Sequence, residues 1–269
     1  MAIAPGTRTR LAVGQTSGLS FDGSPDTVRV EYASGADAVD VEKGEDGSFE
    51  LPLVRVPDLL TLSWAVSGVT VTAQVEAVMA QLCTVADVRA YRPDENPALP
   101  STEDAEIEAK IAKAVTVMET EAARHFQPVL VRGITDRPNC RTTALVLEGD
   151  MASSDIRSVV SATDQEGETV KLRKASATTL DVRDLKPGRF AEVVLEAGMD
   201  PTPADVRDAV CALASWYLTP HAAPDNATST STDLGFMRFV VGGVDGAATS
   251  IPEVNAVIGR YGMKDWRVG

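Results

Sequence analysis

A chain of 269 residues with 44% hydrophobic and 24% charged residues has the balance of a globular protein of two or three folded units, which excludes an intrinsically disordered chain. Its net charge of −14 at pH 7 argues against sequence-specific DNA binding, because that affinity comes largely from Lys and Arg that neutralise phosphates. The same charge suits either simple solubility or an acidic channel along which a polyanion slides without sticking.

Three cysteines, Cys83, Cys140 and Cys211, are spread widely along the chain. Their odd number and spacing favour reduced, small apolar residues over a disulfide framework. No apolar run reaches membrane-spanning length, and the first residues lack the pattern of a signal peptide. We therefore expect a soluble protein that is assembled in the cytoplasm and has no contact with a membrane.

Residues 1–78 are predicted to form an N-terminal β-sandwich. Short runs of β-branched and apolar residues alternate with turn signals such as Asp22-Gly23 and Asp46-Gly47. Short strands at this spacing are typical of a sandwich. The predicted strands cover residues 11–13, 27–32, 48–56, 59–66 and 69–78.

The periodicity changes at Thr84, and residues 79–127 are predicted to be helical. Thr84 and Asp87 form a capping-box pattern for a short helix that must stop before Pro93. Ser101 and Asp104 begin a second helix that is expected to run to about His125. An apolar stripe at helical spacing marks its buried face: Ile107, Ile111, Val115, Met118 and Ala122.

Strand patterns return over residues 128–199, which we interpret as an inserted β domain between helices. Residues 200–250 then supply a helix, begun by Thr202 and Asp205 as a capping box and ended by Pro220, followed by a loop and a possible hairpin. Residues 251–269 are expected to form a last helix and a basic arm. The predicted strands of the inserted domain cover residues 129–134, 142–149, 156–164, 169–174, 179–184 and 190–198.

Residue types that carry catalysis are scarce. His125 and His221 both lie at expected helix C-termini, where a cation interacts well with the helix dipole, and this structural role is favoured over a catalytic one. No spacing of His, Cys or acidic residues matches a metal site. Close carboxylates such as Glu106 and Glu108 are interpreted as solvated helix faces. We expect a non-enzymatic protein with no catalytic residue, no metal and no cofactor.

Two segments are predicted to be candidate contact surfaces. Phe236 and Phe239 lie together in the predicted hairpin, where they form either a local core or a contact between subunits. Trp266 lies in a terminal tail beside Lys264 and Arg267. It is predicted either to anchor a partner or to pack back on its own domain.

Three segments, 82–126, 193–218 and 251–262, together resemble the head-tail connector, or adaptor, proteins of long-tailed double-stranded DNA bacteriophages. They read LCTVADVRAYRPDENPALPSTEDAEIEAKIAKAVTVMETEAARHF, VVLEAGMDPTPADVRDAVCALASWYL and IPEVNAVIGRYG, and the last is similar to adaptors of phages that infect actinobacteria. The resemblance rests on loose hydrophobic patterns in a shared order. It implies an α+β fold with a helical-bundle adaptor core that carries the N-terminal β-sandwich and the inserted β domain.

The resemblance also implies a function and partners. Such a protein forms a homo-oligomeric ring of about twelve subunits beneath the portal protein, with a neck or tail-completion protein below. The ring would lie in the neck of the virion, join the capsid to the tail, and let genomic DNA pass without sequence-specific binding. The C-terminal arm, with Arg260, Tyr261, Lys264, Trp266 and Arg267, would engage the portal.

Two other functions stay open at this point. The two β portions would suit a β-sandwich binding or adhesion module of a virion, and exposed aromatic residues on a sheet face would favour it. A carboxylate-dependent hydrolase is the remote alternative, and it would need two carboxyl groups that converge in a pocket.

Overall fold

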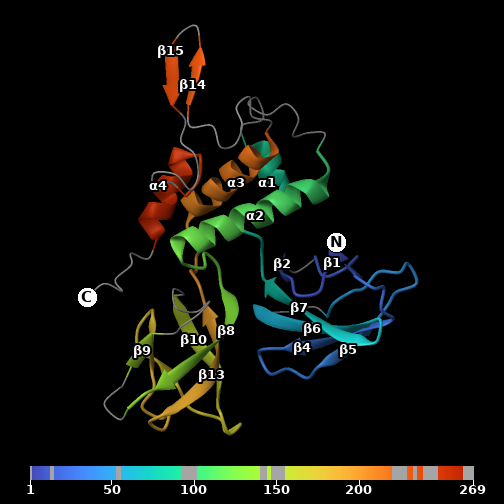
Figure 1. The fold of residues 1–269 in the computed structure, drawn as a ribbon, viewed down its shortest axis with the longest axis vertical. Coiled ribbons are helices and arrows are strands. Elements are labelled where there is room, and N and C mark those ends of the chain that lie inside the picture. The colour runs from blue at the N-terminus through green and yellow to red at the C-terminus, as the bar shows by residue number, and fades with distance from the viewer. Residues whose placement is uncertain are drawn as a thin grey trace. The chain divides into compact units, whose positions relative to one another are not determined.

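The computed structural model describes residues 2–12, 15–52, 56–91, 102–139, 144–146, 155–219, 229–232, 235–238 and 248–262, with only the backbone described at 144–146, 229–232 and 235–238. The chain divides into two compact units. The β unit comprises Met1–Gln81 and Gln127–Asp200, and the helical unit comprises Leu82–Phe126 and Pro201–Gly269 (Figure 1). None of the described helices is both long and apolar enough to span a bilayer.

The first part of the β unit is built on one five-stranded sheet. Its strand order is β2-β7-β6-β4-β5, with β2 parallel to β7 and the other neighbours antiparallel. A two-stranded parallel ladder of β1 and β3 accompanies it. The bounds are β1 Ala2–Ile3, β2 Arg8–Ala12, β3 Ser20–Phe21, β4 Thr27–Tyr32, β5 Val39–Glu42, β6 Asp58–Val66 and β7 Val69–Val78.

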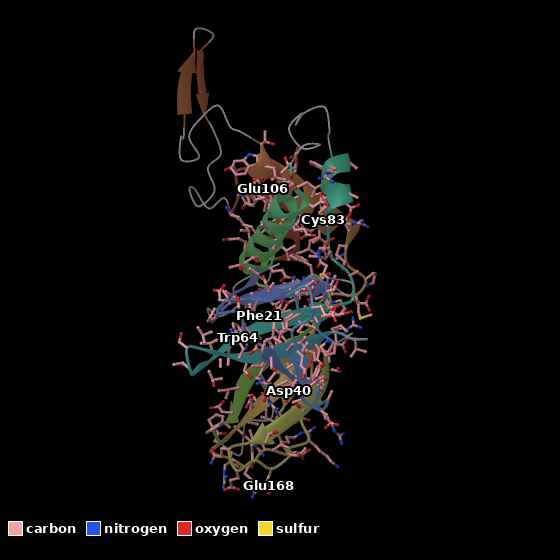
Figure 2. The ribbon with its side chains drawn as sticks, turned by 90° about the vertical axis from the view of Figure 1, so that its right-hand side faces the viewer. Phe21, Asp40, Trp64, Cys83, Glu106 and Glu168 are labelled. Carbon is pink, nitrogen blue, oxygen red and sulfur yellow. A yellow bond between two sulfur atoms is a disulfide. The ribbon has the colours of Figure 1, made fainter. Side chains whose placement is uncertain are left out.

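Alternation along the strands sends one set of side chains into a core. On β6, Leu60, Leu62 and Trp64 are buried at every second position, as a period of two requires. Phe21 meets Trp64 edge to face with ring centroids 5.0 Å apart (Figure 2). The Trp64 Nε1–H donates to the Asp22 carbonyl at 2.9 Å, which satisfies the buried indole.

The second part of the β unit contains two three-stranded sheets. One has the order β10-β13-β8 and the other β11-β12-β9, and all their pairings are antiparallel. Val131, Leu180, Val193 and Leu195 belong to a shared hydrophobic core. The bounds are β8 Val129–Arg137, β9 Ala144–Val146, β10 Ile156–Asp164, β11 Arg173–Lys174, β12 Thr179–Asp181 and β13 Arg189–Ala197.

Helices α1 (Val85–Ala90), α2 (Asp104–Ala122), α3 (Ala204–Leu218) and α4 (Pro252–Tyr261) pack on one another in the helical unit, which also holds the hairpin of β14 (Ser229–Thr232) and β15 (Gly235–Arg238). The capping box predicted at α1 is confirmed, with both of its reciprocal hydrogen bonds present. The predicted apolar stripe of α2 is also confirmed, because all five of its residues are buried. The helix ends at Ala122, three residues before the expected position, and its C-cap Ala123 is in the left-handed conformation.

The predicted fold class, α+β around a helical-bundle adaptor core, is wrong. Fifteen strands and only four helices are present in the described residues, so the structure is mostly β-sheet, although it is mixed α+β overall. The two large hydrophobic clusters that consist wholly of described residues both belong to the β unit. The helical core was inferred from the resemblance of residues 82–126, 193–218 and 251–262 to connectors, whereas the strand patterns over residues 1–78 and 128–199 already indicated a large share of sheet.

Candidate interaction sites

No group of three or more His, Cys, Asp or Glu that could hold a metal occurs in the described ranges. His125 Nδ1 lies 3.2 Å from Glu119 Oε2, and the other oxygen of Glu119 accepts the Phe126 amide at 3.1 Å. This histidine therefore helps to close the C-terminal end of α2. His221 lies outside the described residues.

The close carboxylates that the sequence singles out, Glu106 and Glu108, line neither of the two described hollows. Glu106 and Glu108 are exposed on α2. Where carboxyl groups have shifted pKa values, the shifts are downward: Arg183 lowers the pKa of Asp181 to about 2, and the Thr84 amide and Arg207 lower that of Asp87. A general acid of a hydrolase needs a raised pKa, so these groups are unsuited to that role.

Asp205, in the first turn of α3, is the anchor of the C-terminal helix α4. It accepts the Tyr261 hydroxyl at 2.9 Å and the Arg260 guanidinium. The hydrogen bond to the Asp205 carboxylate raises the pKa of Tyr261, because loss of the phenol proton would set two negative charges side by side. The Arg124 guanidinium donates to the Tyr261 carbonyl at 2.9 Å, and the Tyr261 ring packs edge to face on Phe126.

This arrangement corrects the prediction that Thr202 and Asp205 form a capping box. The N-cap of α3 is Pro203, and no side chain caps the helix. Thr202 Oγ1 donates instead to the Phe126 carbonyl at 2.8 Å. Sequence spacing suggested a local role for Asp205, whereas its partners lie more than fifty residues away in the chain.

The predicted partner-binding residues are only partly within the described structure. Arg260 and Tyr261 are brought together at Asp205, and the Arg260 side chain stays 62% exposed while paired. Phe236 lies on β15 opposite Ser231, but its side chain is not described. The remaining predicted contacts lie outside the described residues: Phe239, Lys264, Trp266 and Arg267.

Cys83 and Cys211 form a disulfide in the helical unit, with Cα atoms 6.2 Å apart. The expectation of reduced cysteines is therefore wrong for this pair, and Cys140 lies outside the described residues. The pairing was hidden because 128 residues separate the two positions in the sequence. The disulfide links the start of α1 to α3, and an ion pair of 2.9 Å between Asp87 and Arg207 joins the same two helices.

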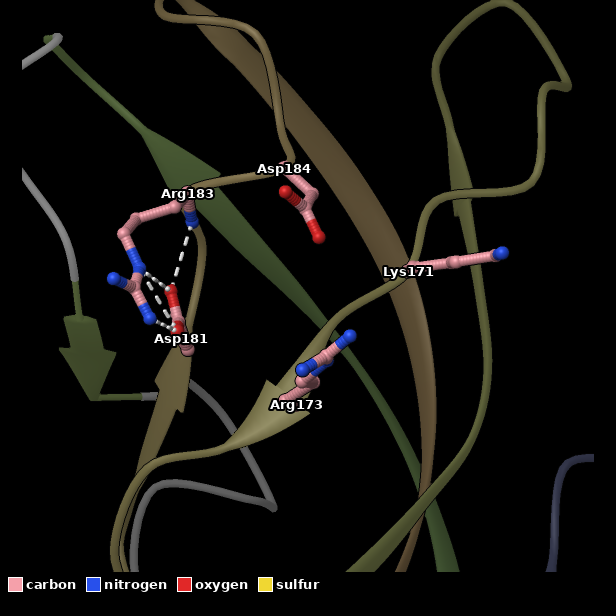
Figure 3. A pocket seen from close by; sticks show the side chains of 5 residues that line it. All are labelled: Lys171, Arg173, Asp181, Arg183 and Asp184. Carbon is pink, nitrogen blue, oxygen red and sulfur yellow. Dashed lines mark hydrogen bonds and ion pairs between the residues drawn. The ribbon is translucent and has the colours of Figure 1, made fainter.

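A basic hollow of about 290 Å³ opens in the second part of the β unit (Figure 3). Lys171, Arg173 and Arg183 line it together with Asp181 and Asp184. Arg183 forks onto both carboxylate oxygens of Asp181, as the dashed lines in Figure 3 show. Charge on this pair is therefore balanced internally.

An acidic hollow of about 560 Å³ opens in the first part of the β unit. Glu42, Asp46 and Glu50 supply its charge, and none of its described lining residues is basic. Asp46 accepts the Ser48 amide at 2.9 Å, which lowers the pKa of Asp46. All three carboxylates are exposed to solvent.

Three large apolar side chains are exposed on the sheet β10-β13-β8: Val160 on β10, which is 40% exposed, and Ile134 and Phe190 on the other two strands. Ile134 on β8 is 59% exposed and Phe190 on β13 is 47% exposed. The register pairs Ile134 with Glu192 and Phe190 with Asp136, so both apolar residues point to the same face of the sheet. An ion pair of 3.2 Å between Arg132 and Glu192 lies on this face as well.

No family model and no curated protein matches the chain. Among solved structures, a chain from the "virion of native gene transfer agent (GTA) particle" is 19% identical, with a TM-score of 0.44, over 66% of this chain and 87% of that one. A chain from the "neck of empty GTA particle" is 16% identical, with a TM-score of 0.40, over 65% of this chain and 87% of that one. Likenesses at this level do not define a family for the chain.

Proposed function

We propose that the protein is a non-enzymatic structural component of the neck of a phage-like particle. It forms a ring beneath the portal, joins the capsid to the tail, and extends the channel for DNA. One observation carries the proposal: the three separate segments that resemble head-tail connectors supply α1, α2, α3 and α4, which fold into one compact unit. Segments scattered in a sequence by chance would not be expected to share a core.

The details of the helical unit favour a scaffold over an enzyme. Its polar side chains connect one helix to another: Arg260 and Tyr261 bind Asp205, and Arg207 binds Asp87. The net charge of −14 suits a channel wall, because carboxylates repel the phosphates of passing DNA and prevent adhesion. A function has to be inferred from the sites of a protein and not from its fold, and the contacts described in the helical unit hold helices together.

Removal of residues 263–269 tests the proposed attachment to the portal. The truncation keeps the contacts of Arg260 and Tyr261 with Asp205, so the circular dichroism of the protein should stay unchanged. Particles assembled with the truncated protein should lack joined tails. A matched full-length variant, Lys264→Gln with Arg267→Gln, retains Trp266 and separates the effect of charge from that of the aromatic anchor.

Two results decide the matter. Normal numbers of tailed, infectious or DNA-delivering particles with the truncated chain would contradict the portal contact of the arm. A protein that electron microscopy of labelled particles never locates at the neck would contradict the proposed function as a whole.

A second candidate, a β-rich binding module of a virion, is favoured by the exposed Phe190 and Ile134 on one sheet face. Exposed aromatic side chains on a sheet provide contact area for a sugar ring or an apolar partner. Substitution Phe190→Ser should then abolish binding of purified particles to host cell-wall carbohydrate and leave particle assembly intact. Unchanged binding by this variant would exclude the candidate.

A further inference from the structure

Bases that lack an ion-paired carboxylate gather on one stretch of the β unit. In the described part of the chain, most Arg side chains are held by a carboxylate, as Arg157 is by Glu196 and Arg189 by Glu166. The six described Lys side chains and Arg173 have no ion-paired carboxylate, and four of these seven bases lie within residues 171–186. These four are Lys171, Arg173, Lys174 and Lys186.

Two of these bases line the basic hollow. Lys171 and Arg173 project from β11 and the segment before it, across from Arg183 (Figure 3). Three bases and two acids line the hollow, and one of the acids, Asp181, is ion-paired with Arg183, so the lining carries a net positive charge. The Arg137 guanidinium donates to the Leu185 carbonyl at 2.8 Å, which holds the chain directly after Asp184.

The acidic hollow offers the opposite charge on the same chain. Glu42 and Glu50 have no ion pair in the described structure, and both are exposed. Asp46 is held in place by the Ser48 hydroxyl at 2.8 Å and the Ser48 amide at 2.9 Å. A hollow lined by three carboxylates and no described base is a counterpart for a cationic surface.

We propose that the basic hollow of one copy of this chain docks on the acidic hollow of a second copy. The inference rests on the proposed function, since a ring needs a contact between neighbouring copies. Two different surfaces of the same chain then meet head to tail, and such heterologous contacts form a ring when the rotation between neighbouring copies closes. Copies with a net charge of −14 repel one another, and a contact that places exposed bases opposite acids offsets this repulsion locally.

A nucleic acid fits the basic hollow less well. Asp181 and Asp184 stand beside the bases and would repel a phosphate chain laid across the hollow. Carboxylates on a protein surface can approach Lys171 and Arg173 one at a time and avoid both aspartates. The charge pattern therefore favours a protein partner over DNA.

A charge-swap experiment on the full-length protein tests this contact. The association of copies is measured by sedimentation velocity for the wild type, for the base-reversed variant Lys171→Glu with Arg173→Glu, and for the acid-reversed variant Glu42→Lys with Glu50→Lys. Each reversal should weaken association about ten- to thirtyfold at about 150 mM salt, as the loss of several exposed charge pairs would. The variant that carries all four substitutions restores complementary charges and should recover association.

Lys174→Glu with Lys186→Glu provides the matched control. It makes the same charge change on the same stretch, but neither residue lines the hollow. This control should associate within about threefold of the wild type. Circular dichroism confirms that every variant is folded, which is expected because all the substituted side chains are exposed.

The outcomes separate the inference from the function on which it rests. An oligomer that is indifferent to both reversals, or a wild type that stays monomeric, overturns the docking contact, while location at the neck of labelled particles still supports the proposed function. Failure of the four-substitution variant to recover association also overturns it. Duplex DNA binding that only the base-reversed variant loses would assign the hollow to phosphate instead.

Discussion

Reduction of the disulfide between Cys83 and Cys211 should strongly destabilise the helical unit. In the chain-entropy view, a cross-link stabilises a protein by restricting the unfolded chain, and the restriction grows with the length of the closed loop. For a sequence separation of 128 residues, the lost entropy corresponds to about 5 kcal/mol at 25 °C. With about 2–4 °C per kcal/mol for a domain of this size, the Tm should fall by about 10–20 °C.

The assay follows thermal unfolding by circular dichroism at the helical band, because all four described helices belong to the helical unit. Wild-type protein is compared with and without dithiothreitol, beside Cys83→Ala with Cys211→Ala and the control Cys140→Ala. The double variant should melt like the reduced wild type and ignore the reductant, whereas the control should respond as the wild type does. A wild-type Tm that does not change with reductant would refute the reasoning, and loss of the response in the Cys140→Ala control would show that the pairing is wrong.

Three further changes probe separate contacts of the helical unit. Met118→Ala removes a fully buried side chain of α2 and should lower the free energy of unfolding in urea by about 2–5 kcal/mol. The control Thr116→Ala, at an exposed position of the same helix, should lower it by under about 0.5 kcal/mol. Equal losses would contradict the packing of Met118. Asp205→Ala should speed hydrogen exchange of the α4 amides about tenfold, because it removes the partner of Arg260 and Tyr261 on α4. Asp208→Ala, which like Asp205→Ala changes an acid of α3, should leave this exchange unchanged. The pKa of Asp87 is lowered in the folded protein, so its stabilising contribution is complete above pH 4 and is lost as the pH falls through the folded pKa. Asp87→Ala should therefore lower the free energy of unfolding by about 1 kcal/mol at pH 6 and leave it unchanged in strong acid. A loss of stability that does not depend on pH would exclude the capping role.

Local elements were predicted well where neighbouring residues alone decide them. The strand predicted over residues 27–32 coincides with β4, and the one over 69–78 coincides with β7. The capping box at Thr84 also forms, because its two bonds join residues three positions apart. In each case the information lies within one strand or one helical turn.

Elements with weak or ambiguous patterns were missed. β5, at Val39–Glu42, is the edge of its sheet, and all four of its residues are exposed or half-buried, so it lacks the alternation that marks a strand. The strand expected over residues 48–56 is absent from the part described, where Phe49 makes an isolated bridge to Leu19. The helical-bundle core has a different origin, since it was implied by the resemblance to connectors and not by the strand patterns.

The candidate sites also contain some features that local sequence patterns predict and others that only the folded structure reveals. Patterns in the sequence identified the C-terminal helix and placed Arg260 and Tyr261 on it, but they assigned Asp205 to a capping box. The sequence did not predict the two charged hollows, because exposed acids and bases are common on any protein surface. Only their convergence around a cavity makes them distinctive.

Periodicity and capping signals were enough to determine the helices, most of the strands and the buried stripe of α2, because these depend on residues within a few positions of one another. Tertiary structure alone decided that Cys83 meets Cys211, that Asp205 anchors α4, and that two opposite charges line separate hollows. These contacts join residues that lie far apart in the chain, and which of many polar or cysteine residues become neighbours is settled by the packing of the cores between them.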